Sequence, residues 1–240
     1  TNWEMFDSKQ DESDSMADQM DRLVEYLQCL PVTMYSIDKV EADDVIAYIA
    51  QQQDKLGNKS TIVSSDKDFL QIVTENINVY SPIKKKFYDP WMVKHELGVI
   101  PENYLVVKSL LGDNSDNLTG VKGLGIKTLL KEFSYITDRP GVTVEDIYAT
   151  CEENLEGKKI FTKILQYKHR VDINLQLMDL QDPVLSDKQK VLIDTILKQK
   201  PNQLNVMAFM YMLEQDKIEG ITKNTEGWLE TFRPLSNLLN

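Results

Sequence analysis

Seven acidic residues fall in three short clusters, each beside an apolar run: Glu41, Asp43 and Asp44, then Asp66 and Asp68, then Asp113 and Asp116. If the fold brings the clusters together, their charges repel one another strongly, and such a site is tolerable only when cations neutralise it. Carboxylate oxygens are hard donors that suit Mg²⁺ or Mn²⁺. The clusters therefore predict a carboxylate-lined site that cuts phosphodiesters with two metal ions.

Each cluster taken alone has a simpler explanation. Acids at a helix N-terminus are often caps, although three acids in residues 41–44 exceed what capping needs. Ser65-Asp66-Lys67-Asp68 has good turn composition, so a turn and a site are about equally supported there. Residues 113–124 fail as a calcium loop, because Leu118 and Leu124 stand where Gly and Glu are required.

Periodicity predicts the elements that must position these acids. After a polar stretch to about Asp14, apolar residues from Met16 to Leu27 indicate a helix that ends at Pro31. A strand at 32–37, a helix at 42–53, a strand at 60–65, a short helix at 68–73 and a strand at 78–81 follow. This order predicts an α/β fold with a mostly parallel sheet. From Pro90 the pattern is helical, with breaks at residues 140–141, 157, 183 and 201.

Residues 120–128 (GVKGLGIKT) form a glycine-rich stretch. A P-loop needs Lys directly after its last Gly, but Ile126 intervenes, and no strand is expected before it. We predict a tight turn between two helices, whose backbone faces a phosphate or a monovalent cation, with Lys122 and Lys127 nearby. A helix C-cap followed by a new helix would describe the same backbone without a ligand.

The net charge of −11 does not exclude nucleic acid as a partner. Residues 61–135 hold nine acids and nine bases, and four of these acids belong to the clusters. If metals neutralise those four, the remaining charge of the segment is basic, which suits a phosphate-binding face. The lysines at 84–86 beside Phe87 are either a basic and aromatic nucleic-acid contact or a solvated hairpin tip.

Other classes of protein are not indicated. No apolar run reaches the length of a membrane span, and no secretory signal opens the chain. Cys29 and Cys151 are far apart and lack metal-binding spacing, which predicts a reduced, cytoplasmic setting. His95 and His169 have no ligand spacing and receive no role.

The order of the clusters is the most specific signal. The stretches at 40–44 (VEADD), 62–69 (IVSSDKDF) and 110–128 (LLGDNSDNLTGVKGLGIKT) resemble the 5′-nuclease (flap endonuclease) family. That family includes the 5′-nuclease domain of bacterial DNA polymerase I and the phage 5′-exonucleases called RNase H. The resemblance is strong from about Val40 to Phe133, and the lysine-rich segment after Val79 leans toward the phage branch.

The resemblance implies a Mg²⁺-dependent, structure-specific 5′-nuclease that removes flaps or RNA primers in DNA replication and repair, on an α/β, PIN-like fold. Mn²⁺ could replace Mg²⁺. All seven acids would be catalytic metal ligands. The first metal site would comprise Glu41, Asp43, Asp44 and Asp66, and the second Asp68, Asp113 and Asp116.

The glycine turn would belong to a helix-hairpin-helix element at about residues 112–135 that grips duplex DNA and holds K⁺. Its DNA-binding residues would be Gly120, Val121, Lys122, Gly123, Gly125, Lys127 and Thr128. Implied partners are branched or duplex DNA, RNA–DNA hybrids, and replication proteins such as a clamp or a single-strand-binding protein. The resemblance further implies a monomer without a membrane partner, in the host cytoplasm if a phage encodes it.

The N-terminal part departs from the family pattern. Family members begin with a strand that carries a metal-binding Asp, followed by a basic helical arch. Residues 1–30 match only the end of that arch and the next helix, so residues 1–111 would be the remaining α/β core and 112–240 a helical region. We therefore expect a fragment or one partner of a split protein. The alternative is a catalytically incomplete chain that docks on branched or duplex DNA. A PIN-type single-strand RNase is a third alternative, against which the glycine turn argues.

Overall fold

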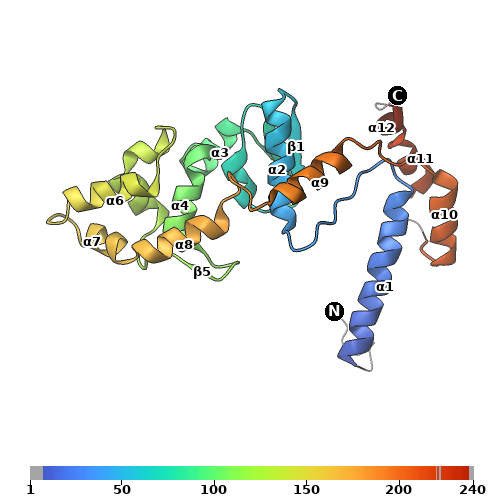
Figure 1. Ribbon diagram of the computed structural model, residues 1–240, viewed down its shortest axis with the longest axis horizontal. Helices are drawn as coiled ribbons and strands as arrows, with labels where there is room; N and C mark the ends of the chain where they lie inside the picture. The colour runs from blue at the N-terminus through green and yellow to red at the C-terminus, as the bar shows by residue number, and fades with distance from the viewer. Residues whose placement is uncertain (1–7, 220, 222, 238–240) are drawn as a thin grey trace. The chain divides into compact units, whose positions relative to one another are not determined.

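The computed structural model describes residues 8–219, 221 and 223–237. The chain divides into two compact units, one made of Thr1–Ile37 with Asp187–Asn240 and the other of Asp38–Ser186 (Figure 1). All seven predicted site acids belong to the second unit. The domain boundary predicted at residues 111–112 falls inside this unit.

The main sheet of the second unit has three strands, β1 (Ser60–Val63), β2 (Ile77–Ser81) and β3 (Lys86–Tyr88). β1 pairs with β2 in parallel, and β2 pairs with β3 as an antiparallel hairpin, the predicted lysine-rich one. The predicted α/β class is confirmed. Within the part of the chain that is described, this sheet is mixed, with one parallel and one antiparallel pairing.

Helix α2 (Ala42–Lys55) precedes β1 and buries Val45, Ala47, Tyr48 and Ala50. The short 3₁₀ helix η2 (Asp68–Ile72) follows β1 and is buried from Phe69 to Ile72. The predicted strand at 32–37 is wrong, because this segment has no strand assignment and pairs with no described strand. Strand propensity alone does not form a strand, which also requires a hydrogen-bonding neighbour.

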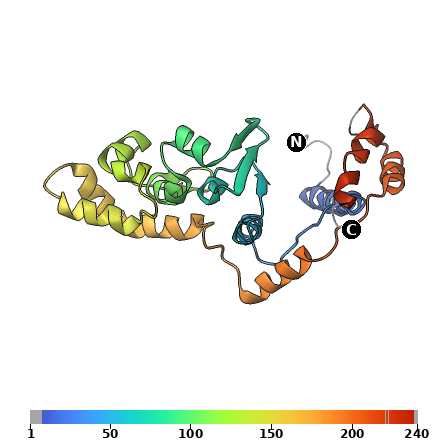
Figure 2. The ribbon, with the colours of Figure 1, turned by 90° about the horizontal axis from the view of Figure 1, so that it is seen from above.

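The rest of the second unit is nearly all helical, as predicted. Helices α3 (Pro90–Leu97) and α4 (Tyr104–Leu111) lead to α5 (Ile126–Glu132), α6 (Val144–Glu153), α7 (Lys159–Gln166) and α8 (Lys168–Met178). The predicted breaks at residues 140–141 and 157 separate α5 from α6 and α6 from α7, and the one at 183 follows α8, whereas the break at Tyr167 between α7 and α8 was not predicted. The sheet lies at one end of the unit and α6 and α7 at the other (Figure 2). The core of this half includes Phe133, Ile136, Ile147 and Ile164, each fully buried.

A small hairpin of β4 (Gly112–Asp113) and β5 (Leu118–Thr119) connects α4 to the glycine-rich stretch. The expected turn between two helices is therefore a turn between a two-residue strand and α5. Two glycines allow the hairpin to close on α4. A Cβ on Gly120 would lie 2.1 Å from the carbonyl carbon of Leu111, and one on Gly112 would lie 2.2 Å from the nitrogen of Gly120.

The first unit contains α1 (Lys9–Gln28), α9 (Asp187–Leu197), α10 (Val206–Gln215), α11 (Thr225–Glu230) and α12 (Arg233–Asn237). The stretch predicted as polar and unpatterned to Asp14 is already helical from Lys9, with Ser8 as its N-cap. Residues 1–7 lie outside the described residues.

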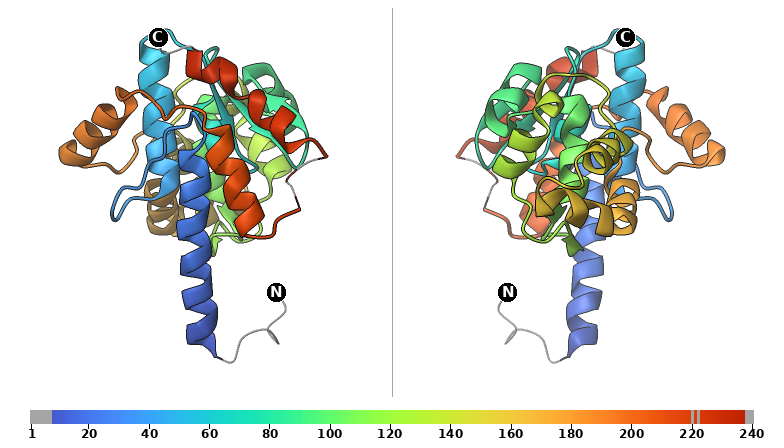
Figure 3. Two further views of the ribbon diagram at one scale, coloured as in Figure 1. Left: turned by 90° about the vertical axis from the view of Figure 1, so that its right-hand side faces the viewer. Right: turned by 90° about the vertical axis from the view of Figure 1, so that its left-hand side faces the viewer.

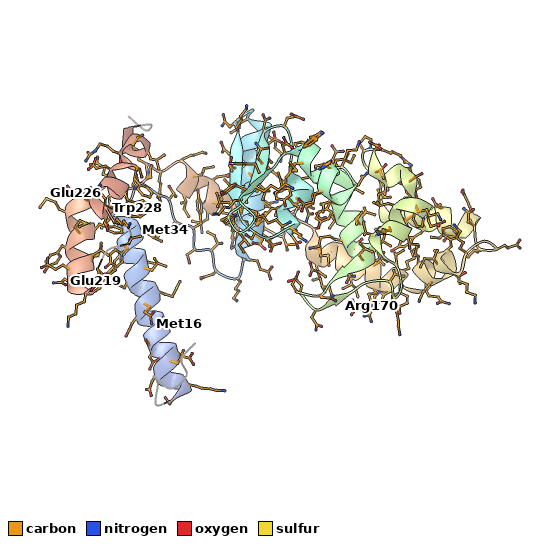
Figure 4. The ribbon with its side chains drawn as sticks, turned by 180° about the vertical axis from the view of Figure 1, so that it is seen from behind. Met16, Met34, Arg170, Glu219, Glu226 and Trp228 are labelled. Carbon is orange, nitrogen blue, oxygen red and sulfur yellow. The ribbon has the colours of Figure 1, made fainter. Side chains whose placement is uncertain are left out.

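Helices α1 and α10 lie side by side (Figures 1 and 3), and the rings of Tyr26 and Phe209 are 4.9 Å apart. Trp228 packs against Phe209 near the C-terminal end of α1, whereas Met16 projects from its exposed face (Figure 4). No helix in the described ranges is long and apolar enough to cross a membrane.

Candidate metal centre

Six of the seven predicted acids line one cavity of about 500 Å³ in the second unit: Glu41, Asp43, Asp44, Asp66, Asp68 and Asp116. They come from three positions, namely the start of α2, the segment after β1 and the β4–β5 hairpin. The convergence of acids predicted from the sequence is therefore present for six residues.

The start of α2 is not explained by capping alone. Glu41 is the N-cap residue, but its side chain makes no capping hydrogen bond. Asp44 instead accepts a hydrogen bond from the backbone nitrogen of Val184 at 3.0 Å. The carboxylates of this cluster therefore point to the cavity and to the segment before α9. Capping would instead require them to accept hydrogen bonds from the backbone at the start of α2.

The second cluster is both a turn and part of the cavity. Oδ1 of Asp66 accepts a hydrogen bond from the backbone nitrogen of Asp68 at 2.8 Å, and Ser64 Oγ accepts one from Asp66 at 3.0 Å. These contacts are those of a polar turn after a strand. The turn holds both carboxylates beyond the C-terminal end of β1, where ligands collect in α/β sheets.

The charges in the cavity act on one another. Burial raises the pKa of the Asp43 carboxyl above its ordinary value. The negative charges that raise this pKa further are, in decreasing order, those of Asp66, Glu41, Asp44 and Asp116. The predicted repulsion is thus a property of this group of acids, and a cation placed among them would relieve it.

Asp113 does not line this cavity and belongs to a neighbouring one with Lys108 and Tyr104. Lys108 is buried on α4, and its Nζ lies 2.9 Å from Oδ2 of Asp113 and also pairs with Asp68. Desolvation alone would raise the pKa of Asp113. Hydrogen bonds from Ser115 and Lys108 outweigh it and lower this pKa to about 2. Asp113 is therefore a stabilised carboxylate, in contrast to the expected mutual repulsion.

Asp179 is a carboxylate of the cavity that the sequence analysis missed. It follows α8, and its Oδ1 accepts hydrogen bonds from the backbone nitrogens of Gln181 and Asp182. The buried Gln71 fixes this wall, because it donates to the carbonyl of Met178 at 2.9 Å and accepts from Leu180 at 3.0 Å. The only signal in the sequence was an acid at a helix end, which is common in any protein.

The acids line the same cavity, but their side chains do not lie close enough together to coordinate one ion. No group of three or more His, Cys, Asp or Glu side chains in the described ranges is tight enough to hold one metal ion. The donor set itself fits a hard divalent cation, since all its members are carboxylates of one cavity. Side-chain rotation would be required for several of them to coordinate one ion.

The predicted DNA-binding residues are arranged around the turn before α5. Gly120 and Val121 are buried, Thr128 is half-buried, and the exposed members are Lys122, Gly123, Gly125 and Lys127. Close packing on Leu111 already explains a glycine at position 120.

In the β2–β3 hairpin, two lysines pair with the carboxylate of Glu96. The distances from Nζ to the carboxylate oxygen are 2.7 Å for Lys84 and 2.5 Å for Lys86.

Comparison with known proteins places the chain among nucleases. Residues 7–98 match the N-terminal resolvase-like domain of 5′-3′ exonucleases. The 5′-3′ exonuclease of Buchnera aphidicola subsp. Schizaphis graminum is 32% identical over 197 residues, which are 80% of this chain and 68% of that protein. DNA polymerase I of Bacillus subtilis is 32% identical over 169 residues, 68% of this chain and 18% of the polymerase.

A solved structure of the T5 5′-exonuclease aligns with a TM-score of 0.57 and 26% identity over 68% of each chain. A T5 flap endonuclease complex shares the fold, with a TM-score of 0.53 and 23% identity over 76% of this chain and 62% of that one. The chain belongs to the family of 5′-3′ exonucleases, a class of phosphodiester hydrolases. The family resemblance stated from the sequence is confirmed.

Proposed function

We propose that the chain supplies a Mg²⁺-dependent, structure-specific 5′-nuclease that removes flaps or RNA primers during DNA replication and repair. The observation that carries the proposal is the convergence of six carboxylates from three separate clusters on one cavity. The fold matches the T5 5′-exonuclease, for which a solved structure is described as holding divalent metal ions, in that case zinc.

In this proposal the first ion is held by Glu41, Asp43, Asp44 and Asp66, and the second by Asp68, Asp113 and Asp116. The chemistry that two bound divalent ions supply is activation of a water and stabilisation of the leaving oxygen of a phosphodiester. Lys108 fixes the orientation of Asp68 and Asp113, because its ammonium group pairs with both carboxylates. Mn²⁺ is expected to replace Mg²⁺, since both prefer oxygen ligands.

The substrate is proposed to be branched or duplex DNA and RNA–DNA hybrids. Lys122 and Lys127 are exposed beside the glycine turn and have no ion-pair partner among the described residues. Their ammonium groups would contact backbone phosphates without reading sequence. The turn itself would face a phosphate, with K⁺ bound at residues 120–125.

A cleavage assay on a 5′-labelled flap substrate tests the proposal. With Mg²⁺ present, Asp66→Asn should lose cleavage by about 100-fold or more, because a charged carboxylate ligand of the metal is replaced by a neutral amide. Glu75→Gln is the matched control, since it removes one exposed negative charge outside the cavity. Cleavage that persists in Asp66→Asn, or that does not require a divalent ion, would contradict the proposal.

A second candidate function is DNA binding without cleavage. It is favoured by the absence, in the described ranges, of any group of three acids tight enough for one metal. The same assay separates the two functions when binding is measured alongside. A chain that binds flap DNA but leaves it uncut at saturating Mg²⁺ is the binding module.

A further inference from the structure

Helix α7 places a lysine at the glycine turn. A Cβ built on Gly123 would lie 3.5 Å from Nζ of Lys163, which is half-buried on α7. Gly123 has a φ of +84°, so its backbone is left-handed and the residue leaves open space beside the ammonium group. The two residues are far apart in sequence, and Lys163 lies outside the predicted helix-hairpin-helix element at residues 112–135.

The position of α7 is fixed by packing on the end of α5. The rings of Phe133 and Phe161 are 5.8 Å apart in an edge-to-face arrangement, and Phe161 and Ile164 are buried. Nζ of Lys158 lies 2.6 Å from Oε1 of Glu132, which adds an ion pair across the same contact. Because α5 begins directly after the turn, these contacts hold Lys163 and the turn in one arrangement.

Lys163 is not neutralised in this arrangement. Within the described ranges Lys163 has no ion pair with an acid. Lys158, the residue just before α7, is in contrast paired with Glu132. Holding an ammonium group close to a backbone turn, without an acid beside it, leaves a positive site that favours an anion.

The turn next to Lys163 also presents free hydrogen-bond donors. The backbone nitrogen of Val121 donates to Leu110 and that of Leu124 donates to Val121. Those of Lys122, Gly123 and Gly125 donate to no backbone carbonyl in the described part of the chain. Adjacent free N–H groups with a nearby ammonium group suit the oxygens of a phosphate.

We propose that Lys163 binds the DNA backbone phosphate that the glycine turn approaches, and so extends the DNA interface from α5 to α7. The proposal rests on the proposed function, which supplies duplex DNA as the ligand. Binding through a phosphate carries no sequence information, so the contribution of Lys163 is the same for every duplex sequence.

The test is a binding titration of the full chain with a labelled plain duplex at several salt concentrations, in EDTA to prevent cleavage. For Lys163→Gln the slope of log affinity against log salt should become shallower by about 0.9, the value for one lost phosphate contact. Lys163→Arg should restore the slope, because it keeps the charge. Lys55→Gln, at the end of α2 beside the sheet, is the control lysine and should leave the slope unchanged.

The outcomes separate the inference from the proposed function. An unchanged slope in Lys163→Gln, with a shallower slope in Lys122→Gln, would overturn the role of Lys163 and leave DNA binding at the turn intact. A wild-type chain that binds no duplex at low salt would overturn this inference, and one that also leaves flap DNA uncut in Mg²⁺ would overturn the proposed nuclease function as well. A thermal melt of Lys163→Gln that matches the wild type excludes unfolding as the cause of a changed slope.

Discussion

Nζ of Lys108 lies 2.9 Å from Oδ2 of Asp113, and both side chains are largely shielded from solvent. The same ammonium group also pairs with Asp68, so one buried cation joins acids of two clusters that are distant in sequence. Asp68 and Asp113 are proposed ligands of the second metal ion. While that ion is not bound, Lys108 would supply the positive charge beside these two carboxylates.

Replacing Lys108 with Met should lower the free energy of unfolding by about 1–3 kcal/mol without divalent ions, because two partly buried carboxylates lose their partner. Mn²⁺ should reduce this loss, since the ion would neutralise the same carboxylates. Urea unfolding with and without Mn²⁺ measures both effects, with Lys55→Met as the control. Equal stability of Lys108→Met and the wild type in EDTA would show that the ion pair contributes nothing.

Asp113→Asn should destabilise the metal-free protein at neutral pH. The pKa of Asp113 is lowered from 3.8 to about 2, so its ionised form stabilises the fold above about pH 4 and this contribution is lost as the pH falls toward 2. The difference in melting temperature between variant and wild type should therefore shrink between pH 4 and pH 2. A variant that is more stable than the wild type at pH 7 would show that repulsion dominates at Asp113.

Asp43→Asn should have the opposite effect and stabilise the metal-free protein at neutral pH. The pKa of Asp43 is raised, first by burial and then by neighbouring acids, so the wild-type fold is destabilised by its charge and gains stability as the pH falls. Removing that charge should raise the melting temperature in EDTA at neutral pH. It should also weaken Mn²⁺ binding in isothermal titration calorimetry. A lower melting temperature in EDTA would mean that Asp43 has a structural role.

Gly120→Ala should destabilise the protein by about 3 kcal/mol or more, because its Cβ would lie 2.1 Å from the backbone of Leu111. Gly125→Ala is the matched control in the same turn. No atom lies within 4 Å of a Cβ at Gly125, whose φ of −114° is open to any residue. That substitution should change stability by less than about 1 kcal/mol. Similar melting temperatures for the two variants would contradict the close approach at Gly120.

The sequence by itself determined the local secondary structure and the chemical types of the side chains at the site. Helical spacing predicted α2 and the helices after Pro90, and β-branched residues predicted β1, because these patterns act over a few residues of chain. The acids were found because each cluster stands at the start or end of such an element. The glycine turn was found in the same way, although the hairpin that precedes it was not.

The tertiary structure decided which residues meet. Residues 32–37 have strand composition, yet they form no strand because pairing depends on a neighbour that local sequence does not specify. The seven acids divide into six that share a cavity and Asp113, which lines a neighbouring cavity and is linked to Asp68 through the buried Lys108. Asp179 joins the cavity, and Lys163 reaches Gly123, through packing between elements far apart in the chain. Contacts of this kind depend on how helices pack, and propensity and spacing along the chain carry no information about them.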